Sequence, residues 1–467
     1  MSTTDARPLA ETWSRPPSLQ DHLAEGRAQR ESHPRESLAS PPVGARDPMG
    51  ILDRQDSTRV PELVPVRTQR MAESAFAFYR GTAALMAADL ARSPGSGLVV
   101  GSCGDAHVSN FGLFASPQRT LVFDLNDFDE SAWAPWEWDV KRLVTSIVIA
   151  GQSTSRDEKV VRDAALGAVR TYARALGNGA KRSPLKRYYD HFDAEAGSSS
   201  LDPESADALH KAVKDAEKRT AARAVRKLTT LDDSGRLVFS EIPPTMTHVD
   251  PRIELRINEF VEQYQQSANI DIRVLLQKYH VTDIARRVVG VGSVGTRCYL
   301  ISMADGDGNA LLLQGKEAGR SVLIEYGEVE QPEGVARYIE QAGEGGRVVA
   351  MQRILQAVSD PFLGYLTGPS VDGPERSFYV RQFHDKKGGF DVDALEDAAF
   401  GWYADACATT LARAHGQSPN ASVVAGYVGG GRVAGEAILE WSYAYADLSR
   451  ADWQLFRRHR GVDQPTG

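Results

Sequence analysis

A glycine- and valine-rich segment interrupts a chain that is otherwise helical in pattern, and this interruption limits the folds that the chain can adopt. Residues 280–385 hold several apolar runs rich in Val, Thr and Tyr, and a Gly/Asp turn at 305–308 separates two of them, which predicts a β-hairpin. On either side, apolar residues recur at helical spacing in 61–90, 136–149 and 395–415. We therefore expect an α+β fold with a small β-rich lobe beside a larger helical lobe.

The overall charge and the distribution of apolar residues exclude several classes of protein. With 62 acidic against 54 basic residues the formal net charge is −8, which argues against a protein that mainly binds nucleic-acid phosphates. No run of about 18 apolar residues is present, so no membrane helix is expected. The cysteines Cys103, Cys298 and Cys407 lie far apart without metal-site spacing, which is typical of a reducing compartment. We expect a cytoplasmic protein with neither a nucleic-acid nor a membrane partner.

The first candidate motif is the Asp105 loop, residues 104–110. Asp105 is followed five residues later by Asn110, on a short loop after an apolar run. Phosphoryl transfer uses a carboxylate that orients the attacking hydroxyl and a nearby carbonyl-type oxygen that holds magnesium. His107 has no second histidine at ligand spacing, so we interpret it as a structural residue. A plain turn before a capped helix is the alternative interpretation of this loop.

The second candidate motif is the acidic segment, residues 123–130. It places four carboxylates within seven residues, directly after an apolar run. Such acids repel one another unless a cation neutralises them, and magnesium prefers oxygen ligands of this kind. Phe123 and Phe128 favour burial at the edge of the core over the alternative of a solvated acidic turn. The segment therefore supplies candidate metal ligands, among them Asp124 and Asp127.

The third candidate motif is a glycine loop followed by a lysine. Two strand-like runs are joined by a loop that contains Gly290, Gly292, Ser293 and Gly295. Glycines at a hairpin tip allow close approach to phosphates, and Lys316 on the next strand would neutralise phosphate charge. In dinucleotide-binding folds the same glycine spacing opens a helix, whereas 297–301 has the pattern of a strand. An ordinary glycine-rich hairpin is the other alternative.

Together the three motifs resemble a known superfamily. The Asp105 loop, with its Gly-Asp-x-His-x-x-Asn pattern, resembles the catalytic loop of aminoglycoside and choline phosphotransferases, which share the protein kinase fold. In those families a metal-binding aspartate follows a strand shortly after the asparagine. Here Asp124 lies 124 − 110 = 14 residues after Asn110, so the spacing favours Asp124 over Asp127 as the main metal ligand.

Further stretches resemble other kinase elements. Residues 138–143 look like the helix that follows in those families, whose aspartate, here Asp139, supports the catalytic loop. Residues 290–316 look like the nucleotide-binding hairpin and its lysine. Residues 379–383 resemble the strand into the hinge, and 411–415 resemble the helix that normally precedes the catalytic loop. Because the catalytic loop comes first in this chain, the resemblance implies a circular permutation, which the proximity of termini in folded domains permits.

The kinase resemblance implies an ATP- and magnesium-dependent phosphotransferase that acts on a hydroxyl acceptor. Lys316 and the glycine loop would hold the ATP phosphates, and Asp105 would position the acceptor. Magnesium would be held by Asn110, Asp124 and Asp127. The acidic partner of the lysine stays open among Glu325, Glu340 and Glu344.

Several alternatives use the same residues. They are a nucleotidyl transferase that moves AMP, a nucleotide-binding regulator without turnover, and a metal-dependent hydrolase that relies on the acidic residues alone. From about residue 47 onward the chain also resembles a bacterial family known as domain of unknown function number 2252, through stretches that include 76–81, 123–130 and 288–295. This second resemblance implies no activity.

These assignments divide the chain into parts. The first 50 residues carry seven prolines and few aromatic or β-branched residues, so 1–45 is expected to be a mobile tail. The other parts are the catalytic-loop and metal-binding part of the helical lobe (46–155), a helical addition (156–279), the small β-rich nucleotide-binding lobe (280–385) and the C-terminal helices of the helical lobe (386–467).

Overall fold

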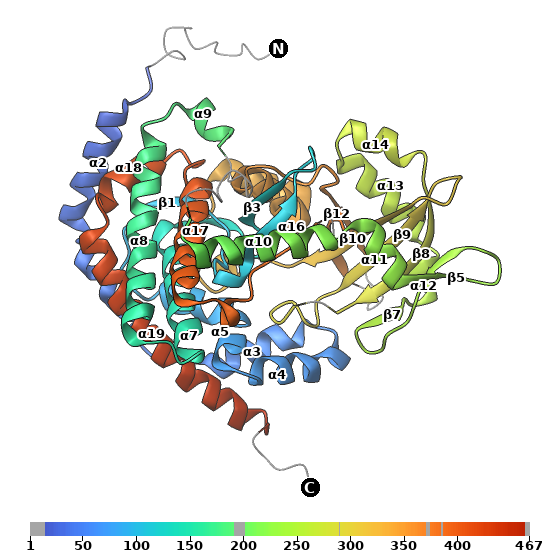
Figure 1. Cartoon of the computed structure of the whole chain (residues 1–467), viewed down its shortest axis with the longest axis horizontal. Helices are drawn as coiled ribbons and strands as arrows, with labels where there is room; N and C mark the ends of the chain where they lie inside the picture. Colours follow the sequence, from blue (N-terminus) through green and yellow to red (C-terminus); the bar gives the residue numbers. More distant parts are fainter. Residues whose placement is uncertain (1–14, 191–200, 289, 370–373, 384–385, 463–467) are drawn as a thin grey trace, which may run out of the picture.

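A helical body and a β-sheet part lie side by side, with the helical body at the left of Figure 1 and the sheet at the right. The structure is a computed structural model that describes residues 15–190, 201–288, 290–369, 374–383 and 386–462. The expected α+β class is confirmed, since helices and antiparallel sheets both contribute to the fold. No helix within the described residues is long and apolar enough to cross a membrane.

The main sheet has six antiparallel strands in the order β11-β12-β10-β9-β8-β7. Its strands are β7 (Met246–His248), β8 (His280–Arg287), β9 (Cys298–Ala304), β10 (Ala310–Ala318), β11 (Gly364–Pro369) and β12 (Glu375–Gln382). The predicted hairpin is confirmed as β9 and β10, and the glycine loop connects β8 to β9. Lys316 on β10 pairs with Cys298, the first residue of β9, so the lysine and the glycine loop lie at the same end of the sheet.

Helices cover both faces of this sheet. They are α11 (Ala221–Leu228), α13 (Ile257–Ser267), α14 (Ile270–Leu276) and α16 (Glu333–Leu355). Neighbouring residues of a strand point to opposite faces. Accordingly, Ile301 of β9 joins the core under α13 and α14, and Leu300 joins the core under α11.

The helical body surrounds one long buried helix, α7 (Trp136–Ser153). α7 is buried on nearly all sides, which is the pattern of a helix enclosed by others. It contacts α8 (Glu158–Ala180), α17 (Asp397–His415) and α19 (Arg432–His459). The buried charged residues of α7 are Glu137, Asp139, Lys141 and Arg142. Such groups need partners, because an unpaired buried charge is costly.

Two short two-stranded sheets bring the candidate motifs to the edge of the helical body. β1 (Val99–Ser102) pairs with β4 (Ala132–Pro135), and β2 (Phe111–Ala115) pairs with β3 (Leu121–Leu125). The Asp105 loop therefore leaves β1 and enters β2. The acidic segment begins in β3 and ends shortly before β4.

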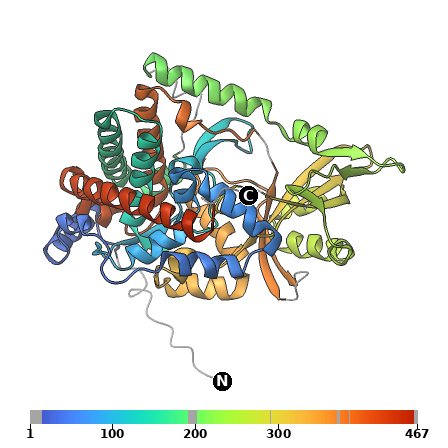
Figure 2. The same cartoon turned by 90° about the horizontal axis from the view of Figure 1, so that it is seen from below.

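A band of short helices, blue in Figure 2, lies between the helical body and the sheet. It comprises α3 (Pro48–Ser57), η2 (Pro61–Leu63), α4 (Val64–Ala72), α5 (Ala75–Arg80) and α6 (Ala83–Leu90). The helical pattern predicted for 61–90 is confirmed, with breaks at Ser74 and Gly81. Ser74 caps α5, because its hydroxyl oxygen accepts a hydrogen bond from Ala77 N at 3.0 Å.

The span 156–279, predicted as a helical addition, also contains strands. α10 (Pro203–Lys218) and α11 are helical as predicted, but β5 (Thr229–Leu231) and β6 (Leu237–Phe239) form a hairpin, and β7 extends the main sheet. Strands of three residues are too short to show a period of their own in a sequence. Short helices elsewhere are η3 (Val108–Asn110), α9 (Pro184–Tyr188), α12 (Pro251–Glu254), α15 (Val322–Glu325) and η5 (Val392–Ala394).

The prediction of a mobile tail over 1–45 is wrong for the part of it that the structure describes. α2 (Leu19–Ser32) and the 3₁₀ helix η1 (Arg35–Ala39) pack on α18 (Ala421–Val428) and α19, at the outer face of the helical body in Figure 1. The prediction of a tail for residues 1–14 concerns residues outside the described part of the chain.

Close backbone approach and arginine contacts explain why this polar segment is ordered. A Cβ atom on Gly26 would lie 2.0 Å from the Val423 carbonyl oxygen, so glycine lets α2 approach α18 closely. Arg30 Nε donates to the Tyr427 carbonyl at 2.9 Å, at the end of α18 where carbonyls lack helical partners. Leu38 adds a fully buried apolar side chain.

Candidate active site

Two adjoining cavities lie where the sheet part meets the helical body. The larger, of about 550 Å³, contains Lys316 in its wall, and the smaller, of about 130 Å³, contains Asp105 and His107. The residues that line both cavities are Arg80, Asn110, Asp127, Gly290 and Ser293. We call this shared set the junction. It is formed by α5, the Asp105 loop, the acidic segment and the glycine loop.

The Asp105 loop is held in place by α7. Cys103 N and Gly104 N donate to the two carboxylate oxygens of Asp139 at 2.8 and 3.0 Å. His415 of α17 lies 3.2 Å from the same carboxylate. Gly104 has a φ of +82°, and a Cβ atom there would lie 2.0 Å from the Glu130 carbonyl oxygen, so this position requires glycine. The predicted support of the loop by Asp139 is confirmed.

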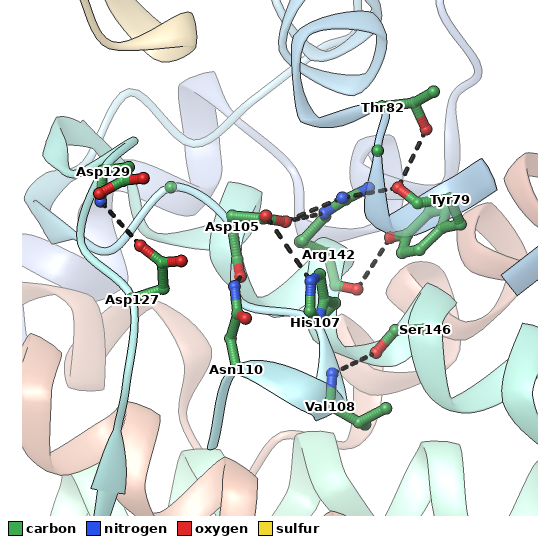
Figure 3. Close-up of polar contacts among 12 residues, drawn as sticks. Tyr79, Thr82, Asp105, His107, Val108, Asn110, Asp127, Asp129, Arg142 and Ser146 are labelled. Atoms are coloured by element: carbon green, nitrogen blue, oxygen red, sulfur yellow. Dashed lines mark hydrogen bonds and ion pairs between the residues drawn. The ribbon is translucent and has the colours of Figure 1, made fainter. Parts of the chain in front are cut away.

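Asp105 is oriented by an arginine of α7, as Figure 3 shows. Arg142 Nε donates to Asp105 Oδ1 at 2.8 Å. Burial raises the pKa of Asp105, although the charge of Arg142 acts in the opposite direction. The second oxygen, Oδ2, lies 3.7 Å from His107 Nε2, and burial lowers the pKa of His107 well below its usual value. His107 is therefore a neutral neighbour, and Asp105 presents an oriented carboxylate to the smaller cavity.

Arg142 is itself fixed by Tyr79 of α5. Arg142 Nη2 donates to the Tyr79 carbonyl at 2.8 Å, and the Tyr79 hydroxyl donates to the Arg142 carbonyl at 2.8 Å. The guanidinium also lies 3.9 Å from the centre of the tyrosine ring, at cation–π distance. α5 and the Asp105 loop are thereby connected through one side chain (Figure 3).

Asn110 turns its side chain toward the same loop. Its Nδ2 donates to the Asp105 carbonyl at 2.8 Å, which leaves the amide oxygen as the atom that can accept or ligate. Asn126 N donates to the Asn110 carbonyl at 2.9 Å, so the Asp105 loop and the acidic segment lie side by side. Because Asn110 is a residue of the junction, its amide oxygen is the atom that it can offer to a ligand there.

Lys316 contacts the acidic segment in the cleft that the two cavities form. Its Nζ lies 3.5 Å from Asp127 Oδ2 and forms a shorter ion pair with Asp129 Oδ2. Lys316 is only 3% exposed, and the Tyr379 hydroxyl donates to Asp129 Oδ1 at 2.8 Å. The structure thus brings together four of the predicted site residues: Lys316, Asp105, Asn110 and Asp127.

The two carboxylates beside Lys316 differ in their pKa shifts. Burial acts to raise the pKa of Asp127, but the charges of Lys316 and Arg381 outweigh it and lower the pKa. For Asp129, burial and the neighbouring charge of Asp127 raise the pKa. The pKa of Lys316 is well above its usual value, because the two carboxylates outweigh its burial. Asp129 binds Lys316 through one carboxylate oxygen and the Tyr379 hydroxyl through the other, whereas Asp127 lines both cavities, so Asp127 is the carboxylate more open to a cation.

Asp124 lies on the opposite side of the acidic segment, so the preference for it as the main metal ligand is corrected. It is 2% exposed within β3, and its carboxylate accepts hydrogen bonds from Leu125 N and Ala357 N at 2.8 Å each. Arg413 Nη1 lies 3.7 Å from the same group. Asp124 lines neither cavity of the cleft. Spacing could not separate it from Asp127, because the direction of its carboxylate depends on packing against α16 and α17.

None of the glutamates considered as partners of Lys316 forms that ion pair in the part of the chain that the structure describes. They are Glu325, Glu340 and Glu344. Glu344 Oε2 instead lies 2.5 Å from Arg347 Nε. Arg347 is buried and donates to the Asp129 carbonyl at 2.8 Å. An arginine, and not a glutamate–lysine pair, therefore joins α16 to the acidic segment.

The glycine loop lines the cleft with only part of its length. Gly290 and Ser293 belong to the junction, and Gly292 lines the smaller cavity. Gly295, predicted as a nucleotide-binding residue, lines neither cavity. A Cβ atom at Gly295 would lie 2.9 Å from Arg59 Cβ, so the assignment is corrected to close packing against the helical band.

Hydrogen bonds attach the glycine loop to the helical band of residues 48–90. They run from Arg70 to the Gly290 carbonyl (2.5 Å), from Arg59 to the Val294 carbonyl, and from Val60 N to the Gly295 carbonyl (2.8 Å). Both ends of the loop are therefore held by the same neighbouring segment.

Sequence reasoning did not single out several residues of the cleft. They are Arg80, Asp129, Arg142, Arg347, Arg381 and Lys387. Asp129 could have been found because it belongs to the acidic segment. Arg142 stands one helical turn after Asp139, so the two share a helix face. The other residues come from distant segments and have no local signal.

Comparison with protein-family models matches residues 59–459 to a family described as uncharacterized protein conserved in bacteria (DUF2252). The match covers most of the chain, so the chain belongs to this bacterial family, as the resemblance in its sequence predicted. No curated protein and no solved structure matched the chain. The family description states no activity, so the function is inferred from the site itself.

Proposed function

We propose that this chain is an ATP- and magnesium-dependent phosphotransferase with a protein-kinase-like fold whose lobe order is circularly permuted. The supporting observation is that Lys316, from the sheet, meets Asp127 in a cleft that also contains Asp105 and Asn110. A kinase site combines the same groups: a strand lysine, a metal-binding aspartate, an acceptor-side aspartate and a loop asparagine.

The order of elements in the sheet part supports the kinase-like fold. The glycine loop joins β8 to β9, and the lysine stands on the next strand, β10. Protein kinases also place their glycine-rich loop before the strand that bears the lysine. β12 leads into Phe383 in the wall of the larger cavity, where a kinase has its hinge. The Asp105 loop precedes all of these elements in the chain, which is the reason for proposing a permutation.

The larger cavity has a suitable size and charge for a nucleotide. Its volume of about 550 Å³ falls among ordinary ligand pockets, which span roughly 300–1,000 Å³. Lys316 and Arg381 in its wall supply positive charge for phosphates. ATP bound there would direct its phosphates toward the junction and toward Asp105.

The donor groups of the junction fit magnesium. Asn110 offers an amide oxygen and Asp127 an ionised carboxylate, and magnesium prefers such ligands. Among the residues that the structure describes, no group of three or more His, Cys, Asp or Glu side chains is arranged to hold a metal. Magnesium commonly takes only one or two carboxylates and completes its shell with water and substrate phosphates. When bound, it would neutralise charge on those phosphates.

The proposed reaction moves one phosphoryl group. The acceptor hydroxyl oxygen bonds to the γ-phosphorus while the bond from that phosphorus to the bridging oxygen breaks, and ADP leaves with the electron pair. The hydroxyl proton passes to the Asp105 carboxylate, which Arg142 orients. A raised pKa suits Asp105 to this task, because the carboxylate then accepts a proton more readily. Lys316 holds the donor phosphates throughout.

Binding and turnover in two variants test the proposal. Calorimetry with ATP and magnesium should detect binding to the parent and a loss of at least about tenfold in affinity in Lys316→Met, which keeps the aliphatic stem and removes the charge. Asp105→Asn should bind ATP as the parent does and should form no product. Incubation of the parent with ATP, magnesium and a bacterial metabolite extract, followed by mass spectrometry, identifies the modified acceptor.

Each outcome separates the proposal from an alternative. A gain of phosphate supports it, and a gain of AMP would indicate nucleotidyl transfer instead. ATP binding without any product would indicate a regulator. Metal-dependent hydrolysis that persists in a folded Lys316→Met protein would reject the kinase-like site in favour of a hydrolase.

A further inference from the structure

Arg80 differs from Arg59 and Arg142, because within the described residues none of its guanidinium nitrogens has a hydrogen-bond or ion-pair partner. It is the last residue of α5 and lines both cavities, so it belongs to the junction. In the part of the chain that the structure describes, its guanidinium makes no hydrogen bond and no ion pair, and its Nε is buried without a partner. Arg80 is therefore a half-buried cation that faces a cavity and not the protein.

The neighbouring arginines of the site each have a hydrogen-bond acceptor within the protein. Arg142 pairs with Asp105, and Arg347 donates to backbone carbonyls of the acidic segment. Arg59 lines only the smaller cavity and donates to the Val294 carbonyl. A guanidinium nitrogen that is buried without a partner, as Arg80 Nε is, costs free energy, and such exceptions are expected where a ligand supplies the missing partner.

The position of Arg80 is fixed by the same contacts that fix Asp105. Its preceding residue, Tyr79, exchanges two hydrogen bonds with Arg142, and Arg142 in turn binds the Asp105 carboxylate. Figure 3 shows Tyr79, Arg142 and Asp105 in this order. Burial acts to lower the pKa of Arg80, and Asp105 and Asp393 oppose this at a distance beyond ion-pair contact. The arginine is thus held near the acceptor-side carboxylate without being neutralised by it.

We propose that Arg80 binds the oxygens of the γ-phosphoryl group as it passes from ATP to the acceptor. This inference rests on the proposed phosphotransferase function. A group in transit must cross from the larger cavity to the smaller one, and Arg80 is the one cation among the junction residues Arg80, Asn110, Asp127, Gly290 and Ser293. Guanidinium groups bind phosphoryl oxygens in a fork and stabilise charge that develops on them during transfer.

The alternative role, binding a negative group on the acceptor, fits Arg80 less well. A residue that contacts only the acceptor would line only the smaller cavity, as Arg59 does. Arg80 also lines the larger cavity, together with Lys316. The two arginines therefore form a natural pair for comparison.

Calorimetry on Arg80→Gln, Arg80→Lys and the matched control Arg59→Gln tests this role. Each protein is titrated with ADP and magnesium, and then with ADP, magnesium and aluminium fluoride, which mimics the phosphoryl group in transit. Arg80→Gln should bind ADP within about twofold of the parent, should bind the mimic about 100-fold more weakly, and should turn over ATP about 10²- to 10³-fold more slowly. Arg80→Lys should lie between the parent and Arg80→Gln, because it keeps the charge without the fork.

Arg59→Gln should change the affinities for ADP and for the mimic by the same factor, since Arg59 has no access to the larger cavity. Arg80→Gln should unfold at nearly the same temperature as the parent, because no hydrogen bond or ion pair within the described residues is lost. Binding of the mimic to Arg80→Gln with parental affinity would overturn the role of Arg80 while leaving the phosphotransferase proposal intact. A parent protein that binds no nucleotide with magnesium would overturn both.

Discussion

Asp124 and Asp127 stand three residues apart in the acidic segment, yet they serve different parts of the molecule. Asp124 lies inside β3 and is 2% exposed, and its carboxylate accepts two backbone N–H groups beside Arg413. Asp127 lies beyond the end of the strand, has a side chain that is 33% exposed, and faces Lys316 across the cleft. The Asp124 carboxylate has its partners inside the protein, whereas the Asp127 carboxylate lines cavities that a ligand can reach.

Structural acids and binding acids of one motif therefore differ in their partners. A buried carboxylate with backbone and arginine partners stabilises the fold, because those donors would otherwise be buried without an acceptor. A carboxylate that faces a lysine at the border of two cavities contributes less to the stability of the fold and is better placed to bind a ligand. Substitutions at the two positions should therefore have different consequences.

The largest expected effect is on turnover in Asp127→Asn. If Asp127 holds magnesium, the neutral amide should lower the rate of ADP formation from ATP by about 10³-fold and remove the magnesium dependence of ADP binding. Stopped assays of ADP formation and calorimetry with and without magnesium measure the two effects. Asp129→Asn, which keeps an oxygen for the Tyr379 hydroxyl, is the matched control and should retain the magnesium dependence. Equal loss in both variants would remove the distinction between the two carboxylates.

The second expected effect is on stability in Asp124→Asn. The amide presents an NH₂ group to donors, so either Leu125 N, or Ala357 N together with Arg413, loses its acceptor inside the protein. The free energy of unfolding should fall by about 2–4 kcal/mol, as measured by urea denaturation. The magnesium-dependent rise in melting temperature with ADP should stay as in the parent. Its disappearance from a folded Asp124→Asn protein would return the metal assignment to Asp124.

The smallest expected effect concerns Glu130, the last acid of the segment. Burial raises its pKa from the usual 4.5 to about 7. A raised carboxyl pKa means that the folded state binds the proton more tightly, so this contribution to stability is lost as the pH rises from about 4.5 through 7. Glu130→Gln imitates the protonated form and should therefore be more stable than the parent at pH 8 by about 1–3 kcal/mol, with little difference at pH 5.

Urea denaturation of both proteins at the two pH values measures this change. Gln can still accept the hydrogen bond that Val322 N donates to Glu130 Oε2 at 2.8 Å, so the contact is not itself removed. The exposed Glu330→Gln is the control and should show no such pH dependence. A parental pH profile in Glu130→Gln would mean that another group is responsible.

The parts of the fold that could be predicted have local causes. The β9–β10 hairpin follows from a Gly/Asp turn between apolar runs, and α7 follows from its apolar residues. The placement of Asp105 and Asn110 on one loop follows from their short spacing. The glycine loop and Lys316 also form a local pattern, but only the resemblance to kinases placed Lys316 in the same site as Asp105.

The parts that could not be predicted depend on contacts between distant segments. The direction of the Asp124 carboxylate is set by Ala357 and Arg413. Ala357 stands 233 residues from Asp124 in the sequence, and Arg413 stands further still. Arg347 joins α16 to the acidic segment by donating to the carbonyl of Asp129, 218 residues away, and no local pattern indicates that contact. α2 is ordered because Gly26 fits against α18, and the sequence of α2 alone contains no sign of that approach.

The attachment of the glycine loop to the helical band has a kinetic consequence. Because Arg70, Arg59 and Val60 hold both ends of the loop, the loop cannot swing away as an independent flap. In the proposed enzyme, nucleotide exchange would require the band and the loop to move as one unit, so the escape of ADP would be coupled to the helices that position Arg80. The residence time of its product would therefore depend on the hydrogen bonds that attach the glycine loop to the helical band.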